Sequence, residues 1–163
     1  MNVRKDSLQD AVRASPLAAG LSQQQVEVLA ALMSKESLAA SEVFAREGTV
    51  DDRLVVVAEG TLDVVRHAGT PGETVLATLR AGDLAHELGF LDGTPRYASL
   101  VASSPARVLT LERARLESLI ETDPRVLYAV MRAIVRTTHQ LQTRLSMQAA
   151  ELTNYVFKQH GRY

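Results

Sequence analysis

The order of apolar and polar residues divides the chain into a helical beginning, a middle of short strands and a helical end. From residue 5 to about residue 33, apolar residues return every three or four positions, as on one face of an α-helix. Ser15-Pro16 and Gly20 break this stretch into a short first helix and a second one. Ser22 is a suitable N-cap for the second helix. Its apolar face would consist of Val26, Leu29, Ala30 and Met33.

From about Glu36 to Leu111 the pattern changes to short β-rich runs separated by glycine-bearing turns. The densest turn signal is the segment Gly69-Thr70-Pro71-Gly72. Seven or eight short strands at this spacing predict an antiparallel double-sheet architecture, a jelly roll or a barrel. The runs are Val43-Phe44, Leu54 to Ala58, Leu62 to Val65, Thr74 to Leu79, Ala98 to Ala102 and Val108 to Leu111.

After Glu112 the helical period returns, first in a short helix around Leu116, Leu119 and Ile120. Asp123-Pro124 then provides a cap and a first-turn proline for a long helix. Apolar positions along this helix alternate in steps of four and three, which is a heptad pattern about four repeats long. The heptad positions are Leu127, Met131, Ile134, Thr138, Leu141, Leu145, Gln148 and Leu152.

Composition restricts the class of protein. A chain of 163 residues with 46% apolar and 23% charged residues is typical of one globular domain with a short appendage. The longest apolar run, Leu54 to Ala58, is far too short to span a membrane, and no apolar region follows the N-terminus. We therefore expect a cytoplasmic protein without a secretory signal or a membrane partner. The absence of cysteine excludes disulfides, thiolate zinc sites and cysteine nucleophiles.

The segment from Gly82 to Ser99 contains the most informative chemistry. It places Glu87 and Arg96 nine residues apart, separated by one predicted helical turn, residues 86–91, and a Gly-Thr-Pro turn. The free N–H groups at the start of a helical turn suit an anion, and an arginine can hold a phosphate through two parallel hydrogen bonds. A carboxylate nearby can accept a hydrogen bond from a sugar hydroxyl. The alternative is that Glu87 and Arg96 pair with each other or lie apart on a solvated surface.

These residues resemble those of a cyclic nucleotide-binding domain, of the type found in catabolite activator protein and in the regulatory subunits of cyclic AMP-dependent kinase. The resemblance extends from about Leu17 to about Leu152 and includes Gly48, Gly60 and Gly82. It implies a mainly β fold, an antiparallel double-stranded β-helix (jelly roll) with N-terminal helices and a long C-terminal helix. The domain boundaries we expect are residues 1–34 for the N-terminal helices, 35–112 for the β-roll and 113–163 for the C-terminal helices.

The family's phosphate-binding cassette reads Phe-Gly-Glu-Leu/Ile-Ala/Gly, followed by an Arg nine residues after the Glu and then a small residue. By resemblance, Glu87 would bind the ribose 2′-hydroxyl and Arg96 the cyclic phosphate. Leu88 and Gly89 would donate backbone N–H groups, and the ligand would be cyclic AMP or cyclic GMP.

Two residues depart from the family pattern. His86 stands where the family has glycine, and Tyr97 stands where it has a small residue. A side chain at position 86 crowds the sugar or strains the backbone, because glycine alone adopts unusual φ/ψ values freely. The Tyr97 ring would fill the space meant for purine or stack on a different ligand.

The long helix allows two interpretations. It packs back along its own β domain as a monomer, or two copies pair as a parallel homodimer through the 124–153 helix. Its length favours the homodimer, because a helix that extends beyond its domain has no local surface for its apolar stripe. In the family, this helix also contributes residues that face the base. Leu141, Gln142 and Thr143 lie at the corresponding depth, and Gln142 is our candidate for the base contact.

Other functions have less support in the sequence. The chain has no His-X-His pair and no nucleophile motif, so we expect neither a metal site nor an enzyme. From Pro124 onward, six Lys or Arg residues face a single Glu151. These charges are spread along a helix, and about ten residues follow the point where a helix-turn-helix domain would begin. We therefore expect a stand-alone domain without direct sequence-specific DNA binding. The aromatic and basic tail, residues 154–163, would either dock on another protein or tuck against the β domain or a dimer partner.

The sequence thus predicts a regulatory domain that binds a cyclic nucleotide and acts on a protein partner by moving its C-terminal helices. The alternative is the same fold with a non-binding pocket, serving as a dimerisation and protein-interaction module. His86 and Tyr97 are the residues that favour this alternative.

Overall fold

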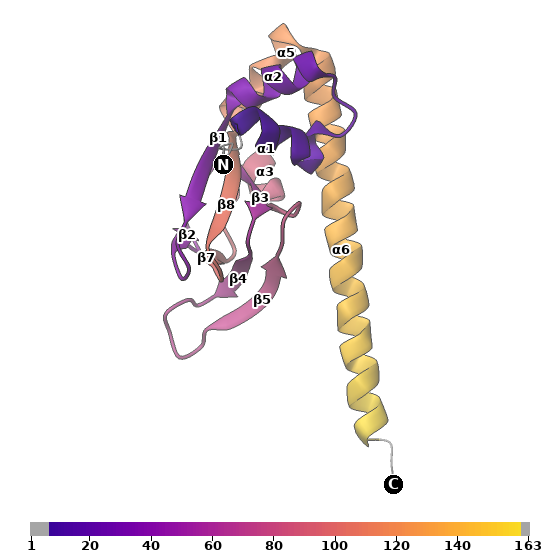
Figure 1. Cartoon of the computed structure of the whole chain (residues 1–163). Coiled ribbons are helices and arrows are strands. Elements are labelled where there is room, and N and C mark those ends of the chain that lie inside the picture. The colour runs from indigo at the N-terminus through magenta and orange to yellow at the C-terminus, as the bar shows by residue number, and fades with distance from the viewer. Residues whose placement is uncertain (1–6, 161–163) are drawn as a thin grey trace, which may run out of the picture.

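The computed structural model describes the backbone of residues 7–160 and the side chains of residues 7–158, arranged as a β-roll with helices on one side (Figure 1). The N-terminal helices are α1 (Leu8–Ala14), the 3-10 helix η1 (Pro16–Ala18) and α2 (Gln23–Leu32). The strands are β1 (Met33–Leu38), β2 (Val43–Ala45), β3 (Arg53–Glu59), β4 (Leu62–Arg66), β5 (Thr74–Leu79), β6 (Leu84–Ala85), β7 (Ser99–Ala102) and β8 (Ala106–Glu112). The remaining helices are α3 (Glu87–Asp92), α4 (Arg113–Glu117), α5 (Leu119–Thr122) and α6 (Pro124–His160).

The N-terminal helices begin at the caps expected from the sequence. Ser22 accepts a hydrogen bond from the backbone N–H of Gln25, whose side chain bonds back to the Ser22 backbone, which completes a capping box. The expected break at Ser15-Pro16 is also present, where the chain turns from α1 into η1. Met33 differs from the expectation, because it is the first residue of β1, where it pairs with Leu111 of β8.

The strands form two four-stranded antiparallel sheets, in the order β1-β8-β3-β6 and β2-β7-β4-β5. This confirms the predicted jelly roll with N-terminal helices and a long C-terminal helix. Two strands escaped the sequence pattern. Strand β6 has only two residues, and β1 carries the polar segment Ser34 to Ser37 between two buried ends. The start of β1 at Met33 also places the first strand two residues before the expected boundary at residue 35.

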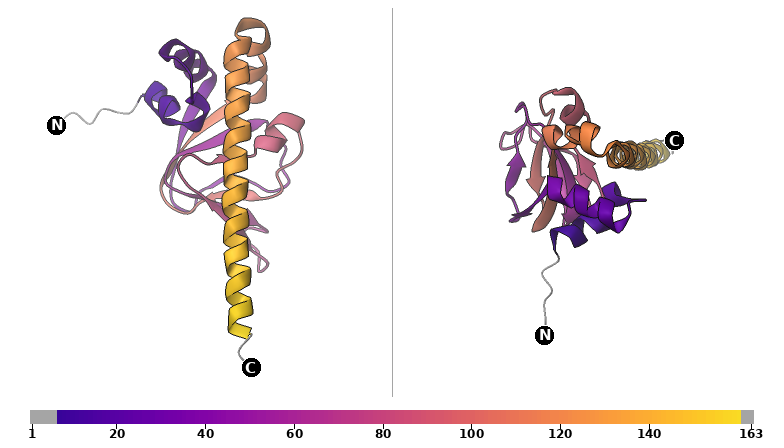
Figure 2. Two further views of the ribbon diagram at one scale, coloured as in Figure 1. Left: turned by 90° about the vertical axis from the view of Figure 1, so that its right-hand side faces the viewer. Right: turned by 90° about the horizontal axis from the view of Figure 1, so that it is seen from above.

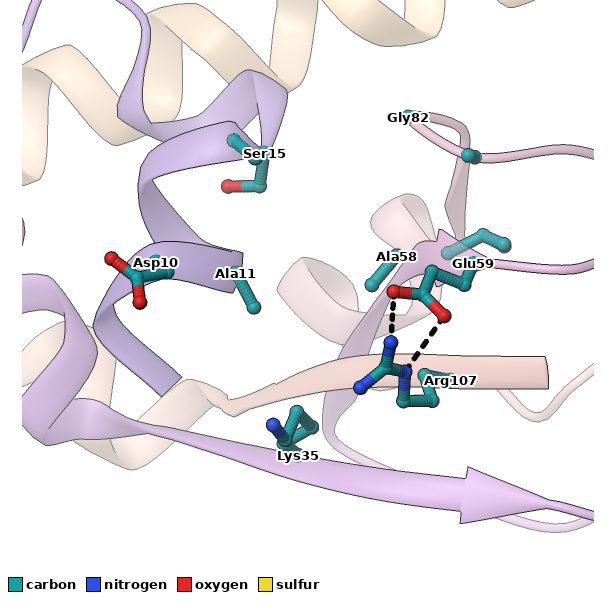
Figure 3. Close-up of a pocket in the computed structure, with 11 residues that line it drawn as sticks. Asp10, Ala11, Ser15, Lys35, Ala58, Glu59, Gly82 and Arg107 are labelled. Carbon is teal, nitrogen blue, oxygen red and sulfur yellow. Dashed lines mark hydrogen bonds and ion pairs between the residues drawn. The ribbon is translucent and has the colours of Figure 1, made fainter. Parts of the chain in front are cut away.

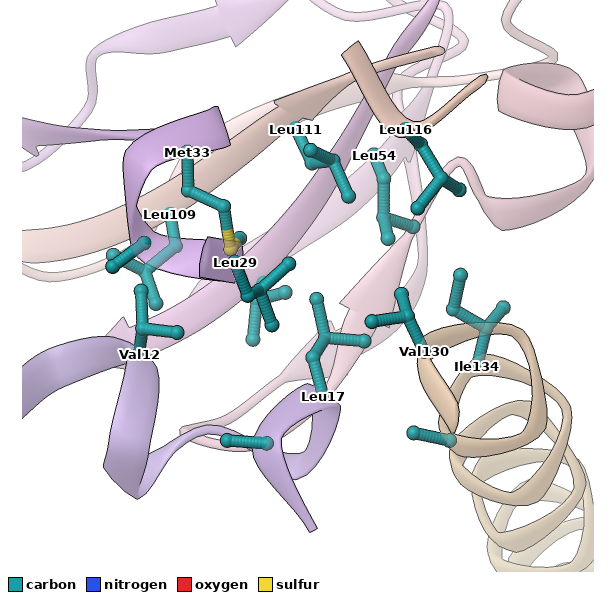
Figure 4. Close-up of a cluster of buried hydrophobic side chains, with 14 of the residues drawn as sticks. Val12, Leu17, Leu29, Met33, Leu54, Leu109, Leu111, Leu116, Val130 and Ile134 are labelled. Carbon is teal, nitrogen blue, oxygen red and sulfur yellow. The ribbon is translucent and has the colours of Figure 1, made fainter. Parts of the chain in front are cut away.

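The sheets and helices enclose two separate cores. One lies between the two sheets, and the other lies between the β1-β8-β3-β6 sheet and the helices (Figure 4). Strand β3 serves both, because successive side chains of a strand point to opposite faces. Leu54 and Val56 face the helices, whereas Val55 and Val57 face the other sheet. The uninterrupted apolar run of this strand therefore results from burial on both faces.

Helix α6 has 37 residues, so it extends about 55 Å at the usual rise per residue. It starts after Asp123, whose carboxylate accepts a hydrogen bond from the N–H of Val126. Figure 2 shows the helix passing along the β-roll and continuing beyond it, as expected from its length. The first half packs on the domain through a buried face that includes Val126, Val130 and Ile134. From residue 146 to residue 158 every described side chain is exposed.

The tail does not fold back on the β-roll in the part that the structure describes. Helix α6 continues through residues 154–160, and both Tyr155 and Phe157 are exposed. Residues 161–163 of the tail lie outside the described residues, as do residues 1–6. Among the helices in the described part of the chain, none has the length and apolar content that crossing a membrane requires.

Candidate functional site

The cassette between Gly82 and Ser99 leaves the core sheet at β6, forms the single helix α3 and returns through a turn to β7. The predicted helical turn at residues 86–91 is thus present, displaced by one residue. His86 is the N-cap of α3 and has a φ of 64° and a ψ of 24°, in the left-handed region. Since this region is costly for most side chains, the backbone at position 86 keeps a conformation that suits glycine, and histidine tolerates it at a cost.

A cavity of about 430 Å³ opens beside α3, within the usual volume range of small-molecule sites. It brings together most of the residues that the sequence singled out. The cassette contributes His86, Glu87, Leu88, Gly89, Arg96 and Tyr97. The strands contribute apolar side chains to the cavity wall, and α6 contributes Leu141 and Leu145.

Arg96 is almost completely buried at this cavity, with 4% of its surface exposed. Its Nη2 donates a 2.9 Å hydrogen bond to Oδ2 of Asp51, so the alternative of a direct Glu87–Arg96 pair is wrong. The Arg96 Nε atom is buried and has no hydrogen-bond partner in the described structure. Because buried donors are almost always satisfied, an unpartnered guanidinium N–H at a cavity indicates a place for an anionic ligand.

Asp51 connects Arg96 to a second arginine. Its carboxylate accepts hydrogen bonds from the backbone N–H, Nε and Nη2 of Arg53, at 2.9–3.0 Å. Burial raises the pKa of Asp51, but the hydrogen bonds from Arg53 and Arg96 outweigh this effect and lower the pKa to about 2. Burial lowers the pKa of Arg96, because it disfavours the charged guanidinium, and the Asp51 carboxylate opposes this effect. Asp51 therefore neutralises part of the charge of Arg96 and leaves its Nε without a hydrogen-bond partner among the described residues.

His86 turns its ring toward the same aspartate. Its Nε2 lies 2.6 Å from the backbone oxygen of Asp51, which is close enough for a strong hydrogen bond. The ring lies directly over Gly89, where an added Cβ atom would collide with the imidazole. Burial lowers the pKa of His86, and the nearby Arg96 charge lowers it further. A neutral imidazole thus fills the space between α3 and the Asp51 loop.

Glu87 and Tyr97 lie near each other at the cavity. Burial raises the pKa of Glu87, and its only resolved opposing interaction is with its own backbone N–H. Tyr97 is 67% exposed, and local desolvation, followed by the Glu87 charge, raises the pKa of its phenol. Glu87 is therefore a hydrogen-bond acceptor available to a ligand, and Tyr97 is an uncovered aromatic ring beside it.

Gln142, our candidate for the base contact, is exposed on α6 and is not part of the cavity wall. Leu141 and Leu145 reach the cavity instead, because they lie on the side of α6 that faces the domain. The sequence indicated the correct segment of α6 for the pocket, but it did not indicate which face of the helix points toward the pocket. It also did not assign a role to Asp51, although the Asp51-Asp52 pair before a strand was visible in the sequence.

A second cavity, of about 380 Å³, lies between α1 and strands β1, β3 and β8 (Figure 3). Glu59 and Arg107 form an ion pair across its wall, and Ala58 beside them packs on the helix-side core. No cassette residue beyond Gly82 lines this cavity. The cassette residues that the sequence associates with ligand binding, from His86 to Tyr97, therefore line the first cavity and not this one.

The cassette cavity contains the kinds of groups that bind a small anion-bearing molecule. It has a buried cation, a carboxylate acceptor, the free N–H groups of the first turn of α3, and apolar walls. His86 provides no side-chain cap for that turn, so those N–H groups face no competing acceptor from the cap residue. Within residues 7–158, no three His, Asp or Glu side chains cluster closely enough to hold a metal ion.

The sequence profile of the cyclic nucleotide-binding domain matches residues 35–123. The chain is 31% identical over 112 residues to cGMP-dependent protein kinase, isozyme 1, of Drosophila melanogaster, covering 67% of this chain and 15% of that protein. It is 28% identical over 104 residues to the CRP-like cAMP-activated global transcriptional regulator of Mycobacterium tuberculosis, covering 64% of this chain and 46% of that protein. The chain thus spans less than half the length of either relative.

A similar fold occurs in the crystal structure of a cyclic nucleotide-binding domain from Methylobacillus flagellatus KT. The TM-score is 0.74 at 23% identity, and the superposition covers 86% of this chain and 79% of that one. The profile match over residues 35–123 agrees with the observed fold, which has two antiparallel sheets and the cassette helix α3. The chain belongs to the cyclic nucleotide-binding domain family.

Proposed function

We propose that this chain is a sensor that binds cyclic AMP or cyclic GMP in the cassette cavity. The observation that carries the proposal is the buried Arg96 side chain, whose Nε has no partner among the described residues. A cyclic phosphodiester carries one negative charge at any physiological pH, so a permanently charged guanidinium is the appropriate partner. Asp51 already holds the Nη2 side of the guanidinium, which orients the rest of the group for the phosphate.

The remaining groups match the other parts of a cyclic nucleotide. Glu87 would accept a hydrogen bond from the ribose 2′-hydroxyl, and the N–H groups of Leu88 and Gly89 would bind phosphate oxygens. The exposed Tyr97 ring offers a stacking surface for the base at the rim of the cavity. Leu141 and Leu145 give the base an apolar boundary on the helix side, in place of the polar contact expected from Gln142.

The output surface would be α6, which contributes to the cavity wall and then extends beyond the domain. A ligand that binds differently to two positions of α6 shifts the helix between them and so changes the surface offered to a protein partner. No catalytic step is needed, and the proposed activity is regulated binding.

We further propose that α6 mediates a parallel homodimer, through a seam rotated from the one predicted by sequence. Ile134 is 2% exposed and packs on the chain's own helix-side core, so its side of the helix is already occupied. On the neighbouring face of α6, residues recur at heptad spacing, and the β-roll does not cover them fully. Tyr128, Val135 and Leu152 on this face are each more than 60% exposed. The exposed members of this outward seam are Tyr128, Val135, Gln142, Ala149, Leu152 and Val156. Met131, Thr138 and Leu145 lie at its edge and are partly buried against the chain's own domain. Gln142 then has a role as a polar seam residue that sets the register.

Calorimetric titration with cyclic AMP, cyclic GMP and 5′-AMP tests the proposed function. We expect saturable binding of at least one cyclic nucleotide and no comparable binding of 5′-AMP, whose doubly charged open phosphate lacks the ring geometry. Absence of binding to both cyclic nucleotides would support the alternative of a dimerisation and interaction module with a non-binding pocket. The observation that favours this alternative is the His86 ring, which lies within the cassette where the family has glycine.

A further inference from the structure

A bidentate ion pair joins α6 to the turn at the start of the cassette. Arg144 donates from Nη1 to Oδ1 of Asp83 at 3.1 Å and from Nη2 to Oδ2 of the same carboxylate at 2.5 Å. The side chains are 23% and 10% exposed, so the pair is largely shielded from water. Parallel hydrogen bonds between a guanidinium and a carboxylate are directional, and they fix orientation as well as distance.

The pair lies where α6 has little else to hold it. On the N-terminal side of the pair, buried apolar side chains as far as Ile134 and the buried Thr137 anchor the helix. On the C-terminal side, every described side chain after residue 145 is exposed. Three other arginines of α6 have no ion pair or hydrogen bond within residues 7–158; these are Arg125, Arg132 and Arg136. Arg144 is thus distinguished from its neighbours by a specific partner on the β-roll.

Asp83 is held by hydrogen bonds at the start of the cassette. Its Oδ2 accepts the backbone N–H of Arg80, and its backbone oxygen accepts the N–H of Val57 in β3. Strand β6 follows at once and leads into His86 and Glu87. A displacement of the cassette would therefore move the Asp83 carboxylate.

On the helix side, Arg144 is flanked by the two residues that line the cavity. Leu141 precedes it by three positions and Leu145 follows it, so all three lie toward the domain. The distance of these leucines from the cavity depends on the position of this part of α6. The Asp83–Arg144 pair sets that position from the cassette side.

We infer that Asp83 and Arg144 are positioning residues for nucleotide binding: their ion pair holds α6 against the cassette and places Leu141 and Leu145 at the base. This inference rests on the proposed function, since it assigns the pair a role at the same cavity. The pair does not touch the ligand. It acts through the leucines, and it connects the cassette to the part of α6 that leaves the domain.

A double-mutant cycle with cyclic AMP and cyclic GMP tests the role in binding. Arg144→Gln should weaken the affinity by about fivefold or more, and Asp83→Asn should do the same while keeping an oxygen that accepts the Arg80 N–H. The double variant should bind no more weakly than either single variant, because the interaction is already lost in each. Arg144→Lys should recover part of the affinity, and the matched control Arg136→Gln should leave it unchanged. Unchanged affinity in Arg144→Gln, or losses that add in the double variant, would overturn the role.

A measurement on the ligand-free protein separates this inference from the proposed function. The chain has no cysteine, so spin labels can be attached at Ser37→Cys in β1 and Ala150→Cys in α6, both exposed positions. The labelled protein is diluted with excess unlabelled protein, so that only distances within one chain are recorded. We expect a narrow distance distribution that becomes broader or longer in Arg144→Gln and narrows again in Arg144→Lys. If the wild type binds no cyclic nucleotide, the proposed function fails while this result still decides whether the pair holds α6. An identical distribution in wild type and Arg144→Gln would refute the inference.

Discussion

Arg96 pairs with Asp51, a residue 45 positions earlier in the chain, through a 2.9 Å hydrogen bond between a buried guanidinium and a partly buried carboxylate. Two backbone hydrogen bonds explain why they meet: Arg96 N–H donates to the oxygen of Thr49, and Gly48 N–H donates to the oxygen of Arg96. Gly48 has a φ of 81°, which lets the loop turn back to make these bonds. The position of Arg96, the proposed partner of the phosphate, is therefore determined jointly by the cassette and by the loop before β3.

Arg96→Ala should weaken cyclic nucleotide binding by at least about tenfold, because it removes a charge-assisted partner of the phosphate. Arg96→Lys should recover little, since a compact ammonium group cannot reproduce the planar donor geometry of the guanidinium. The fold should survive, because Asp51 keeps its hydrogen bonds with Arg53. Titration calorimetry measures the affinities, with Arg136→Ala as the matched arginine control. Tight wild-type binding that is indifferent to Arg96→Ala would rule out this site.

Glu87→Gln should weaken binding less than Arg96→Ala does and should act mainly on the sugar. The carboxylate would accept a hydrogen bond from the 2′-hydroxyl, and a neutral amide oxygen is a weaker acceptor. The affinity ratio between a cyclic nucleotide and its 2′-deoxy analogue should therefore fall toward one in the variant. Competition titrations with the two ligands measure this ratio. Equal discrimination in wild type and variant would show that Glu87 does not contact the ribose.

Gly89→Ala should destabilise the ligand-free protein, because the added methyl group collides with the His86 ring and breaks its hydrogen bond to Asp51. In the His86→Gly background the collision is absent, and the same substitution should be neutral or stabilising by up to about 1 kcal/mol, as for glycine replaced inside a helix. Thermal unfolding of the four proteins measures this coupling. Equal changes in the free energy of unfolding in both backgrounds would show that the two residues do not interact.

Cyclic nucleotide binding should tighten as the pH falls through the range in which His86 titrates. Burial and the Arg96 charge lower the pKa of His86 below its ordinary value of 6.5, so the free protein holds a neutral ring at pH 7. A bound phosphate anion would partly offset the Arg96 charge and raise this pKa, which couples binding to proton uptake. The other charged groups that act on His86 are Asp51 and Asp92, and Asp51 remains ionised in this range because its pKa is about 2.

Calorimetry in buffers of different ionisation enthalpy gives the number of protons taken up on binding. We expect net uptake below about pH 6.5 in the wild type and its loss in His86→Gly. For the ligand-free protein the sign is opposite. A lowered pKa in the folded state means that protonation of His86 favours unfolding, so stability should decline as the pH falls below about 6.5. Proton uptake that persists in His86→Gly would assign the titration to another group.

Val135→Glu combined with Leu152→Glu should convert the proposed homodimer to a folded monomer, because both side chains lie on the uncovered seam of α6. Ile134→Glu should instead unfold the domain, since it places a carboxylate in the helix-side core. Sedimentation velocity with circular dichroism distinguishes these outcomes, and Gln140→Glu on another face of the helix is the control. A wild-type protein that is monomeric at high micromolar concentration would exclude the homodimer.

The amino-acid sequence by itself determined the elements that depend on local chemistry. The Ser22 cap, the break at Ser15-Pro16 and the start of α6 at Asp123-Pro124 follow from interactions within a few residues, and all three are present. The jelly roll followed from the spacing of strands and turns, and the cassette followed from Glu87 and Arg96 at their characteristic separation.

Tertiary structure decided every feature that depends on contacts between distant segments. The pattern of α6 predicted an apolar stripe but not which side the β-roll would occupy, so Ile134 became a core residue and Gln142 lay outside the cavity. The two-residue strand β6 and the polar strand β1 exist because neighbouring strands supply their hydrogen bonds. The Asp51–Arg96 and Asp83–Arg144 pairs span 45 and 61 residues of chain. Charge and spacing identify residues able to form such pairs, but only the folded chain decides which of them come within hydrogen-bond distance.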